Sequence, residues 1–323
     1  MADAYTGTPS VGWDQAAWDR LAYFAFRPEV HFDALCDVKP TRQSMPGKTV
    51  NFTQVGDLAI ATTALSESVD VDAVAMSDSQ VTLTLAEFGN ATITTGFLRA
   101  VSFLPVDAIQ AEVIGANMGQ SLDVIAANTA KSGTNVRYAK GSGAQQTSRA
   151  ALLATNTLTG HDARVARADL KRANVPQVTS MGGGSYLSII HPDVLIDLQE
   201  ETGHNGWRDA HIYARPEEIF NGEFGKFEGF RYIETTNAPL FADAGSGSVV
   251  DVYATLFLGR QALAKAFSNQ DGNGPYPHVV QGPVTDKLRR FVPLGWYWIG
   301  AYGIFRQAAL RRVESSSSIG ANT

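Results

Sequence analysis

The feature that most limits the fold is a stretch of fifty residues, 49–98, that contains no lysine or arginine. Its two ends, Thr49–Leu58 and Gln80–Thr95, alternate apolar and polar side chains as strands do. We expect a long two-stranded excursion here, with Gly89 and Asn90 forming a turn. An isolated hairpin is only marginally stable in water, so this one must rest on its own subunit or on a neighbouring one.

The same stretch is uniformly acidic. Its acidic residues are Asp57, Glu67, Asp70, Asp72, Asp78 and Glu87. Two other stretches are basic: residues 131–172 hold eight lysines and arginines, and residues 287–312 hold six. One chain therefore carries segments of opposite charge, and complementary charge helps to select a partner.

Helical patterns surround this excursion. A first helix is expected over Asp14–Phe26, which Pro28 ends. After Pro105, apolar residues recur at helical spacing as far as Lys131, which predicts a helix of about 39 Å over Val106–Lys131. Further helices are expected over Asp162–Asn174, behind a capping box at Thr159, and after His191 and Pro192.

Composition excludes several classes of protein. The chain has 323 residues, 44% of them hydrophobic and only 18% charged, so most of it can bury a core. The net charge of -6 disfavours a protein whose main task is to coat nucleic acid. The single cysteine, Cys36, cannot form an internal disulfide. We read no secretory signal and expect no membrane span.

The motifs of common enzymes are absent from the sequence: it has no phosphate-binding loop, dinucleotide fingerprint, zinc-protease helix or nucleophile elbow. Residues 269–274 resemble half of a calcium loop, but Val280 stands where its bidentate glutamate belongs. We therefore expect no metal, cofactor or catalytic residue.

A group of histidines and carboxylates leaves one enzymatic alternative open. It comprises His161, His191, His204, His211, Asp193, Glu200 and Asp209. These could serve a metal-dependent or general-base enzyme of the cytoplasm. We favour the simpler interpretation that His191 caps a helix and the others make ordinary hydrogen bonds. A nucleic-acid-binding module is a third option, because Arg164, Arg167 and Lys171 share one helical face.

Ordered landmarks in the second half carry a family resemblance. They are the strand and helix around Ser185–Pro192, the glycine and aromatic pattern of Gly225–Phe230, the Asn237–Pro239 segment, the strand and Leu-Gly-Arg of Tyr253–Arg260, and the closing Leu294–Trp296 and Arg312–Glu314. Together they resemble the major capsid proteins of tailed bacteriophages. The first half matches by architecture: an arm, an extended hairpin and then a long helix.

The resemblance implies the α+β fold first seen in bacteriophage Hong Kong 97, and it implies a division of the chain. The expected parts are an N-terminal arm (1–45), an extended loop (46–100), a peripheral domain with a spine helix (101–157 and 278–314), an axial domain (158–277) and a polar tail (315–323). The protein would be a structural subunit without catalysis, forming the hexamers and pentamers of an icosahedral head around double-stranded DNA.

The resemblance also implies partners and a location. We expect contact with other copies of the chain, a separate scaffolding protein, a portal, a decoration protein in some cases, and nonspecific contact with packaged DNA. The subunit would assemble in the host cytoplasm and end in the virion capsid. We expect the acidic hairpin to face basic residues of a neighbour, namely Arg137, Lys140, Lys287, Arg289 and Arg290.

Overall fold

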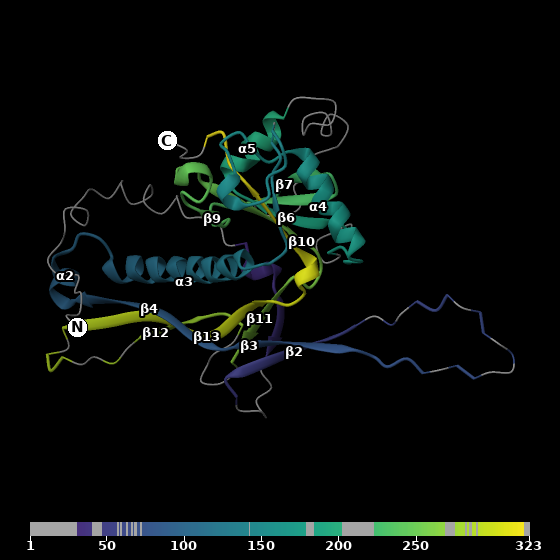
Figure 1. Ribbon diagram of the computed structural model, residues 1–323. Helices are drawn as coiled ribbons and strands as arrows, with labels where there is room; N and C mark the ends of the chain where they lie inside the picture. The colour runs from purple at the N-terminus through teal and green to yellow at the C-terminus, as the bar shows by residue number, and fades with distance from the viewer. Residues whose placement is uncertain are drawn as a thin grey trace.

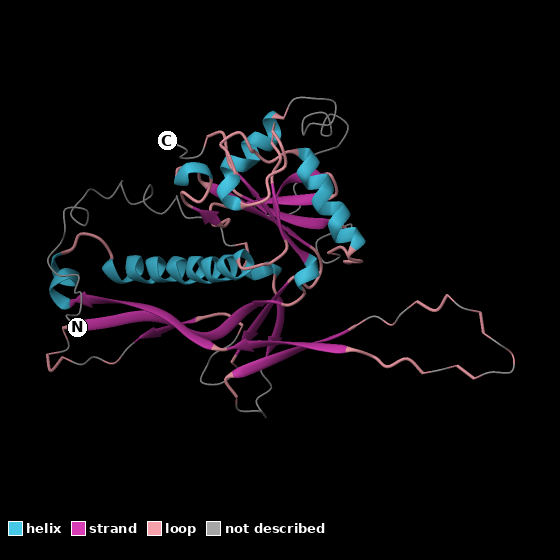
Figure 2. Ribbon diagram, in the orientation of Figure 1, coloured by secondary structure: helices cyan, strands magenta, loops and turns pink. Residues whose placement is uncertain are grey.

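The computed structural model describes most of the chain from residue 31 onward. The described residues are 31–40, 47–56, 58, 60–62, 64–65, 67, 70–71, 73–141, 143–178, 184–201, 223–268, 275–281, 283, 286–288 and 290–319. The expected helix over 14–26 and the calcium-loop-like segment 269–274 lie outside them. Helices and sheets are mixed, as the α+β prediction requires (Figure 2).

The long helix α3 spans Val106–Lys131, the bounds expected from the sequence. Pro105 precedes it, Asp107 lies in its first turn and Lys131 in its last, which suits the helix dipole. Its buried residues include Ile114 and Leu122, which pack with tryptophans of the sheet beneath. The helix therefore lies along that sheet as a strut (Figure 1).

The sheet beneath α3 has five strands. Their order is β1-β11-β13-β12, with β4 also paired to β13. The strands are β1 (Asp37–Pro40), β4 (Ala86–Thr95), β11 (Leu263–Phe267), β12 (His278–Gln281) and β13 (Phe291–Ile304). As the apolar pattern predicted, β13 is a largely buried strand, and it pairs with all three of β4, β11 and β12.

The turn expected at Gly89 and Asn90 is wrong. Both residues lie inside β4, opposite Tyr297 and Trp296 of β13. A Cβ atom on Gly89 would come within 2.7 Å of the carbonyl oxygen of Trp296. Glycine is thus needed here for close approach of two backbones rather than for a turn.

The second sheet has seven strands and lies above the C-terminal end of α3 in the view of Figure 1. Its strands are β5 (Val136–Tyr138), β6 (Tyr186–Ile190), β7 (Glu223–Phe227), β8 (Phe230–Glu234), β9 (Leu240–Phe241), β10 (Val252–Leu258) and β14 (Leu310–Ser315). Apolar residues of α4 (Gly160–Arg172) and α5 (Pro192–Glu200) join its core. The predicted capping box at Thr159 and Asp162 and the cap by His191 are both present.

The two sheets divide the chain differently from the expected domain ranges. Strand β11 was expected in the axial range but lies in the five-stranded sheet, whereas β5 and β14 were expected in the peripheral ranges but lie in the seven-stranded sheet. The chain therefore crosses between the two sheets after β4, after β10 and after β13. Strand pairing, which the linear pattern does not reveal, decides these boundaries.

The first residues of the expected polar tail are buried. Ser315 ends β14, and Ser315, Ser316 and Ser317 are all fully buried. The hydroxyl groups of Ser316 and Ser317 donate to the carbonyl oxygens of Ala154 and Asp193. These hydrogen bonds offset the cost of burying the hydroxyl groups of Ser316 and Ser317.

Short helical turns connect these parts. They are α2 (Gly96–Val101), η1 (Asp33–Leu35), η2 (Arg149–Ala151), η3 (Ser246–Ser248) and η4 (Gln307–Ala309).

Candidate inter-subunit surfaces

A hairpin projects from the body of the molecule (Figure 1). It consists of β2 (Thr49–Val55) and β3 (Asp78–Thr84), which pair antiparallel over their whole length. Its outer part, residues 56–77, forms two extended arms without strand pairing in the described positions. This confirms the expected two-stranded excursion, although only Gln80–Thr84 of the expected second strand belongs to it, and Ala86–Thr95 forms β4 of the five-stranded sheet.

The base of the hairpin is fixed to the five-stranded sheet by apolar contacts. Phe52 is fully buried, and its ring centroid lies 5.7 Å from that of Phe305. Leu83 packs so closely against Gly303 that a Cβ atom on the glycine would lie 2.0 Å from the leucine Cδ2. The base is therefore rigid, while the outer arms find no comparable support in the described part of the subunit.

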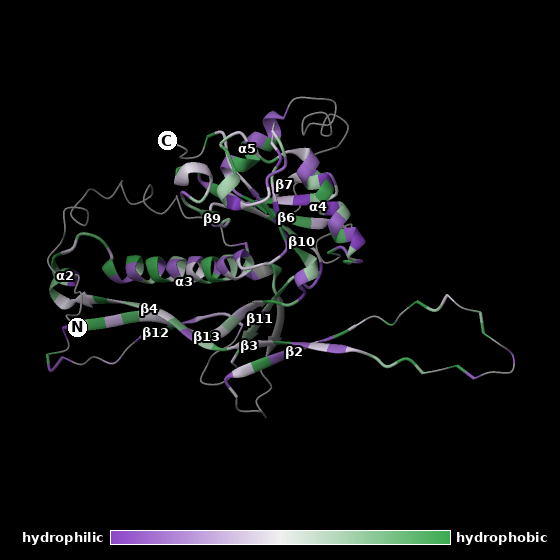
Figure 3. Ribbon diagram, in the orientation of Figure 1, coloured by the Kyte–Doolittle hydropathy of each residue, from purple (hydrophilic) through white to green (hydrophobic). Residues whose placement is uncertain are grey.

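The outer arms are apolar as well as acidic (Figure 3). Seven large apolar side chains from Val55 to Met76 are more than half exposed. They are Val55, Leu58, Ile60, Leu65, Val71, Val74 and Met76. Ile60 is 87% exposed and Met76 is 70% exposed. Contiguous apolar exposure of this kind marks a surface that a partner covers.

The predicted acidic residues occupy different elements. Glu67 and Asp70 are exposed on the outer arms, and Asp78 is exposed at the start of β3. Glu87 lies on β4 of the five-stranded sheet rather than on the hairpin. Asp57 and Asp72 lie outside the described residues.

The predicted basic residues divide into paired and exposed ones. Arg137 forms an ion pair of 2.9 Å with Asp169, and Arg290 forms one of 2.9 Å with Asp286 of its own chain. The side-chain hydrogen bond from Arg290, helped by its charge, lowers the pKa of Asp286. Lys140 and Lys287 are exposed. Arg289 lies outside the described residues.

The basic face of α4 is used within the subunit. Arg164 pairs with the carboxylate of Glu228 at 3.2 Å, and Arg167 donates to the carbonyl oxygen of the same residue. Gly229 adopts a positive φ there, and a Cβ atom on it would contact the Arg167 side chain at 3.1 Å. These arginines therefore hold the β7–β8 turn against the helix.

Of the described members of the histidine and carboxylate group, the structure brings together only His191 and Asp193, which have a structural role. His191 Nδ1 accepts a hydrogen bond from the backbone N–H of Asp193, while the Tyr253 hydroxyl donates to the Asp193 carboxylate at 2.8 Å. Burial lowers the pKa of His191, against the opposing charge of Asp193. His161 is exposed, and His204, Asp209 and His211 lie outside the described residues. Among the described residues, no three potential ligands are grouped to hold a metal ion.

Sequence reasoning missed two buried polar anchors. The fully buried Asp123 of α3 accepts hydrogen bonds from the backbone N–H groups of His31 and Phe32. The ammonium of Lys265, 2% exposed, lies 2.5 Å from Asp33, which also accepts a hydrogen bond from Tyr302. Burial and the charge of Asp33 raise the pKa of Tyr302. The sequence contained one signal of the Asp123 anchor, namely an aspartate next to Leu122 on an otherwise apolar helix face.

Comparison with known proteins decides the family. The sequence model of a family described as phage capsid protein matches residues 8–311, nearly the whole chain. The chain belongs to this family. A search of curated proteins gives no match. The predictions of a tailed-phage major capsid protein and of the Hong Kong 97 type of fold are both confirmed.

Solved structures give the same fold. This phage capsid protein is similar to the capsid of Ralstonia phage GP4, with TM-score 0.74, 16% identity, and coverage of 97% of this chain and 96% of that one. The capsid of cyanophage Pam1 gives TM-score 0.67 and 14% identity over 99% and 97% of the two chains. An encapsulin complex from Synechococcus elongatus gives TM-score 0.55 and 13% identity over 100% and 95%. The fold thus also occurs outside phages, and the family match assigns this chain to the phage proteins.

The capsid family indicates a structural protein of the virion capsid, and the enzyme alternative finds no support. No helix among the described residues combines the length and apolar character needed to cross a membrane.

Proposed function

We propose that this phage capsid protein is the repeating subunit of an icosahedral head, in which hexamers and pentamers enclose double-stranded DNA. The observation that carries the proposal is the hairpin, which exposes seven large apolar side chains at the end of β2 and along its outer arms. Leaving them in water is unfavourable at about 25 cal/mol per Å² of apolar surface. A neighbouring subunit provides the missing cover.

Charge contributes less to this contact than the sequence indicated. Arg137 and Arg290 already form ion pairs within the subunit, whereas Lys140 and Lys287 are exposed and form no ion pair among the described residues. Each exposed ion pair contributes about 0–1 kcal/mol. We infer that apolar burial supplies most of the contact energy, and that Glu67, Asp70 and Asp78 set orientation and partner choice.

The remaining partners follow from the same function. A separate scaffolding protein would set the size of the shell, a portal would occupy one vertex, and a decoration protein could cover the outside. Packaged DNA would make nonspecific contacts with the inner surface. Assembly would take place in the host cytoplasm.

Removal of the outer hairpin tests the function directly. Residues 57–76 are replaced by Asn-Gly, a two-residue connection that suits paired strands. The wild-type chain is expected to form closed shells with five-fold and six-fold capsomers in electron micrographs. The shortened chain is expected to keep its circular dichroism spectrum and remain unassembled.

A matched control distinguishes loss of the hairpin from loss of any apolar surface. Leu153 is 49% exposed and lies in the loop after η2, so Leu153→Ser should leave assembly unchanged. Shells of normal size from the shortened chain would contradict the proposal.

A further inference from the structure

A lysine lies in the core of the five-stranded sheet. Lys265 is the middle residue of β11, whose five residues are all buried, and its side chain is 2% exposed. Its ammonium lies 2.5 Å from Oδ1 of Asp33 in η1. The ring centroids of Tyr276, Trp298 and Tyr302 lie 5.2, 5.2 and 5.5 Å from the lysine Nζ. The amine and the carboxylate therefore meet beside aromatic rings, in a site that is largely closed to water.

The backbone holds both groups in this position. Lys265 pairs directly with Tyr302 of β13, so the two side chains share one face of the sheet. Asp33 follows Phe32, a fully buried residue whose N–H is bound by the Asp123 carboxylate of α3. The amine and the carboxylate are thus each anchored through their own element. Holding two reactive groups in contact in this way raises the rate of a reaction between them.

The third member of the site is the Tyr302 hydroxyl. It donates a hydrogen bond to the same Oδ1 atom of Asp33. Burial and the charge of Asp33 raise the pKa of Tyr302, so the phenol keeps its proton. A donor held against a carboxyl oxygen stabilises the negative charge that develops there when a nucleophile adds to the carboxyl carbon. An amine, a carboxyl group and a proton donor are therefore assembled as amide formation requires.

We propose that Lys265 and Asp33 condense into an amide bond within one chain, with the Tyr302 hydroxyl assisting the departure of a carboxyl oxygen. The ammonium first passes a proton to the carboxylate. Nζ then forms a bond to Cγ of Asp33, one Cγ–O bond breaks, and the oxygen leaves as water with the two protons that the nitrogen releases. One ammonium and one carboxylate give one amide and one water, so no oxidant or cofactor is needed. The step also removes two charges whose burial is unfavourable.

The bond fastens the expected N-terminal arm to the five-stranded sheet. The two linked positions are 232 residues apart in the sequence. A covalent link that closes so long a loop restricts the unfolded chain and thereby favours the folded one. Both residues belong to the same copy, so the inference goes beyond the proposed function and does not depend on shell assembly.

Mass spectrometry of the intact denatured chain tests the bond. The wild type and the Lys265→Arg variant are produced in parallel, because arginine keeps the positive charge but has no amine that can form the amide. After allowance for the substitution, the wild type is expected to be lighter by the mass of one water molecule. Equal masses would overturn the bond while leaving the shell function in place.

Peptide mapping locates the bond and needs no variant, so it decides the result even where Lys265→Arg fails to fold. Trypsin does not cleave after a lysine whose side chain is part of an amide. The wild-type chain should therefore release one branched peptide that joins residues 21–42 to residues 261–287. Two separate linear peptides, or a loss of water confined to another peptide, would overturn the proposal.

Two tyrosine variants test the hydroxyl. Tyr302→Phe keeps the ring beside Lys265 and removes the donor to Asp33, so the linked fraction of newly made chain should fall. Tyr276→Phe is the matched control, because it removes a hydroxyl from another ring near Lys265 and should link as the wild type does. Equal linked fractions in the two variants would overturn the role of Tyr302.

Discussion

The Asp123 carboxylate accepts a hydrogen bond of 2.9 Å from the side-chain amide of Asn237. The same carboxylate accepts the backbone N–H groups of His31 and Phe32, so one buried side chain joins the arm, the long helix and the second sheet's connecting loop. Three segments far apart in sequence depend on it. Replacing Asp123 therefore tests what holds these three segments together.

Replacing Asp123 by alanine is expected to lower the free energy of unfolding by about 3 kcal/mol or more. The change leaves two buried backbone N–H groups and the Asn237 amide without their acceptor, and hydrogen bonds to charged groups contribute about 1.5–3 kcal/mol each. Urea denaturation of unassembled subunits measures the effect. On the same helix, the carboxylate of Asp107 is 65% exposed, so Asp107→Ala should cost less than about 1 kcal/mol. Equal effects of the two substitutions would refute the role of Asp123.

The contact between Gly303 and Leu83 predicts a compensating pair. Gly303→Ala is expected to destabilise the subunit by about 1–3 kcal/mol, because the new methyl group overlaps the leucine side chain. Adding Leu83→Ala makes room for that methyl group. The double variant should therefore lose less stability than the sum of the two single variants, which a double-mutant cycle measures by thermal or urea unfolding. Strict additivity would show that the hairpin base does not depend on this contact.

Acid should weaken the seven-stranded half of the subunit through His191. Burial lowers its pKa below 6.5, so the unfolded chain binds a proton at a pH where the folded chain does not. The free energy of unfolding therefore falls as the pH drops from about 6.5 through the folded pKa. Protonation would also remove the Nδ1 acceptor from the helix cap, while the nearby Asp193 carboxylate favours the charged ring.

The substitution His191→Asn keeps a capping side chain and removes the titration. Its stability should change less between about pH 7 and about pH 5 than that of the wild type, as urea midpoints at the two pH values would show. His161 is exposed, so His161→Asn should retain the wild-type dependence. The interpretation fails if His191→Asn shows the full wild-type dependence.

Reversal of the hairpin charges tests the electrostatic share of assembly. Asp70, Asp72 and Asp78 are changed to lysine together, and the subunits should still fold. Because exposed pairs contribute about 0–1 kcal/mol each, we expect slower assembly that light scattering detects and that depends on salt. The triple neutral variant with asparagine should lie between the wild type and the lysine variant. Unchanged assembly rates at low salt would exclude an electrostatic contribution.

Sequence reasoning worked best where one local pattern was strong. The bounds of α3, the capping box at Thr159 and Asp162, the His191 cap and the apolar strand β13 all depend on neighbours within a few residues. The ordered landmarks of the second half identified the family. The predicted turn at Gly89 was wrong because a glycine required for close approach of two backbones looks the same in sequence as a glycine in a turn.

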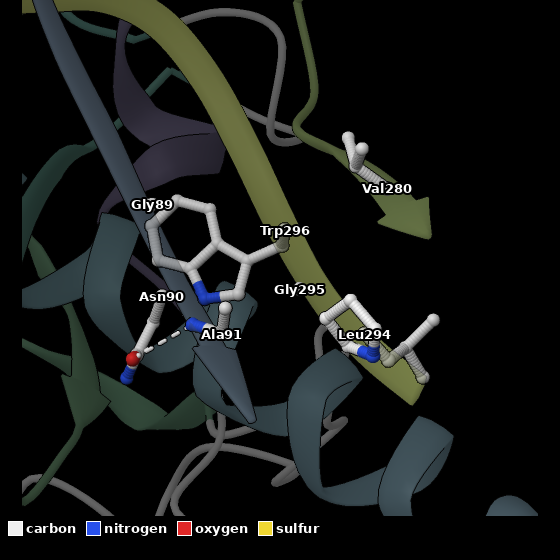
Figure 4. Close-up of a pocket in the computed structure, with 8 residues that line it drawn as sticks. Gly89, Asn90, Ala91, Val280, Leu294, Gly295 and Trp296 are labelled. Atoms are coloured by element: carbon white, nitrogen blue, oxygen red, sulfur yellow. Dashed lines mark hydrogen bonds between the residues drawn. The ribbon is translucent and has the colours of Figure 1, made fainter. Parts of the chain in front are cut away.

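The inter-subunit surface could be predicted only in part. The hairpin and its acidic character follow from residues 49–98, but its apolar character matters only once the structure shows that the outer arms are exposed. Ion pairing of Arg137 with Asp169 spans 32 positions, and no linear pattern selects that partner. Strand β4 lies far along the chain from β12 and β13, so only the folded chain reveals that these strands share one sheet (Figure 4).

The repeated crossing of the chain between the two sheets affects when a newly made chain can complete its fold. The five-stranded sheet needs β13 to join β4, β11 and β12, and the seven-stranded sheet needs β14 to join β5 to β10. Both strands lie near the carboxyl end, within residues 291–315. A polypeptide still under synthesis, or cut short before this region, can complete neither sheet. We therefore expect that only chains extending through β14 can be incorporated into a particle.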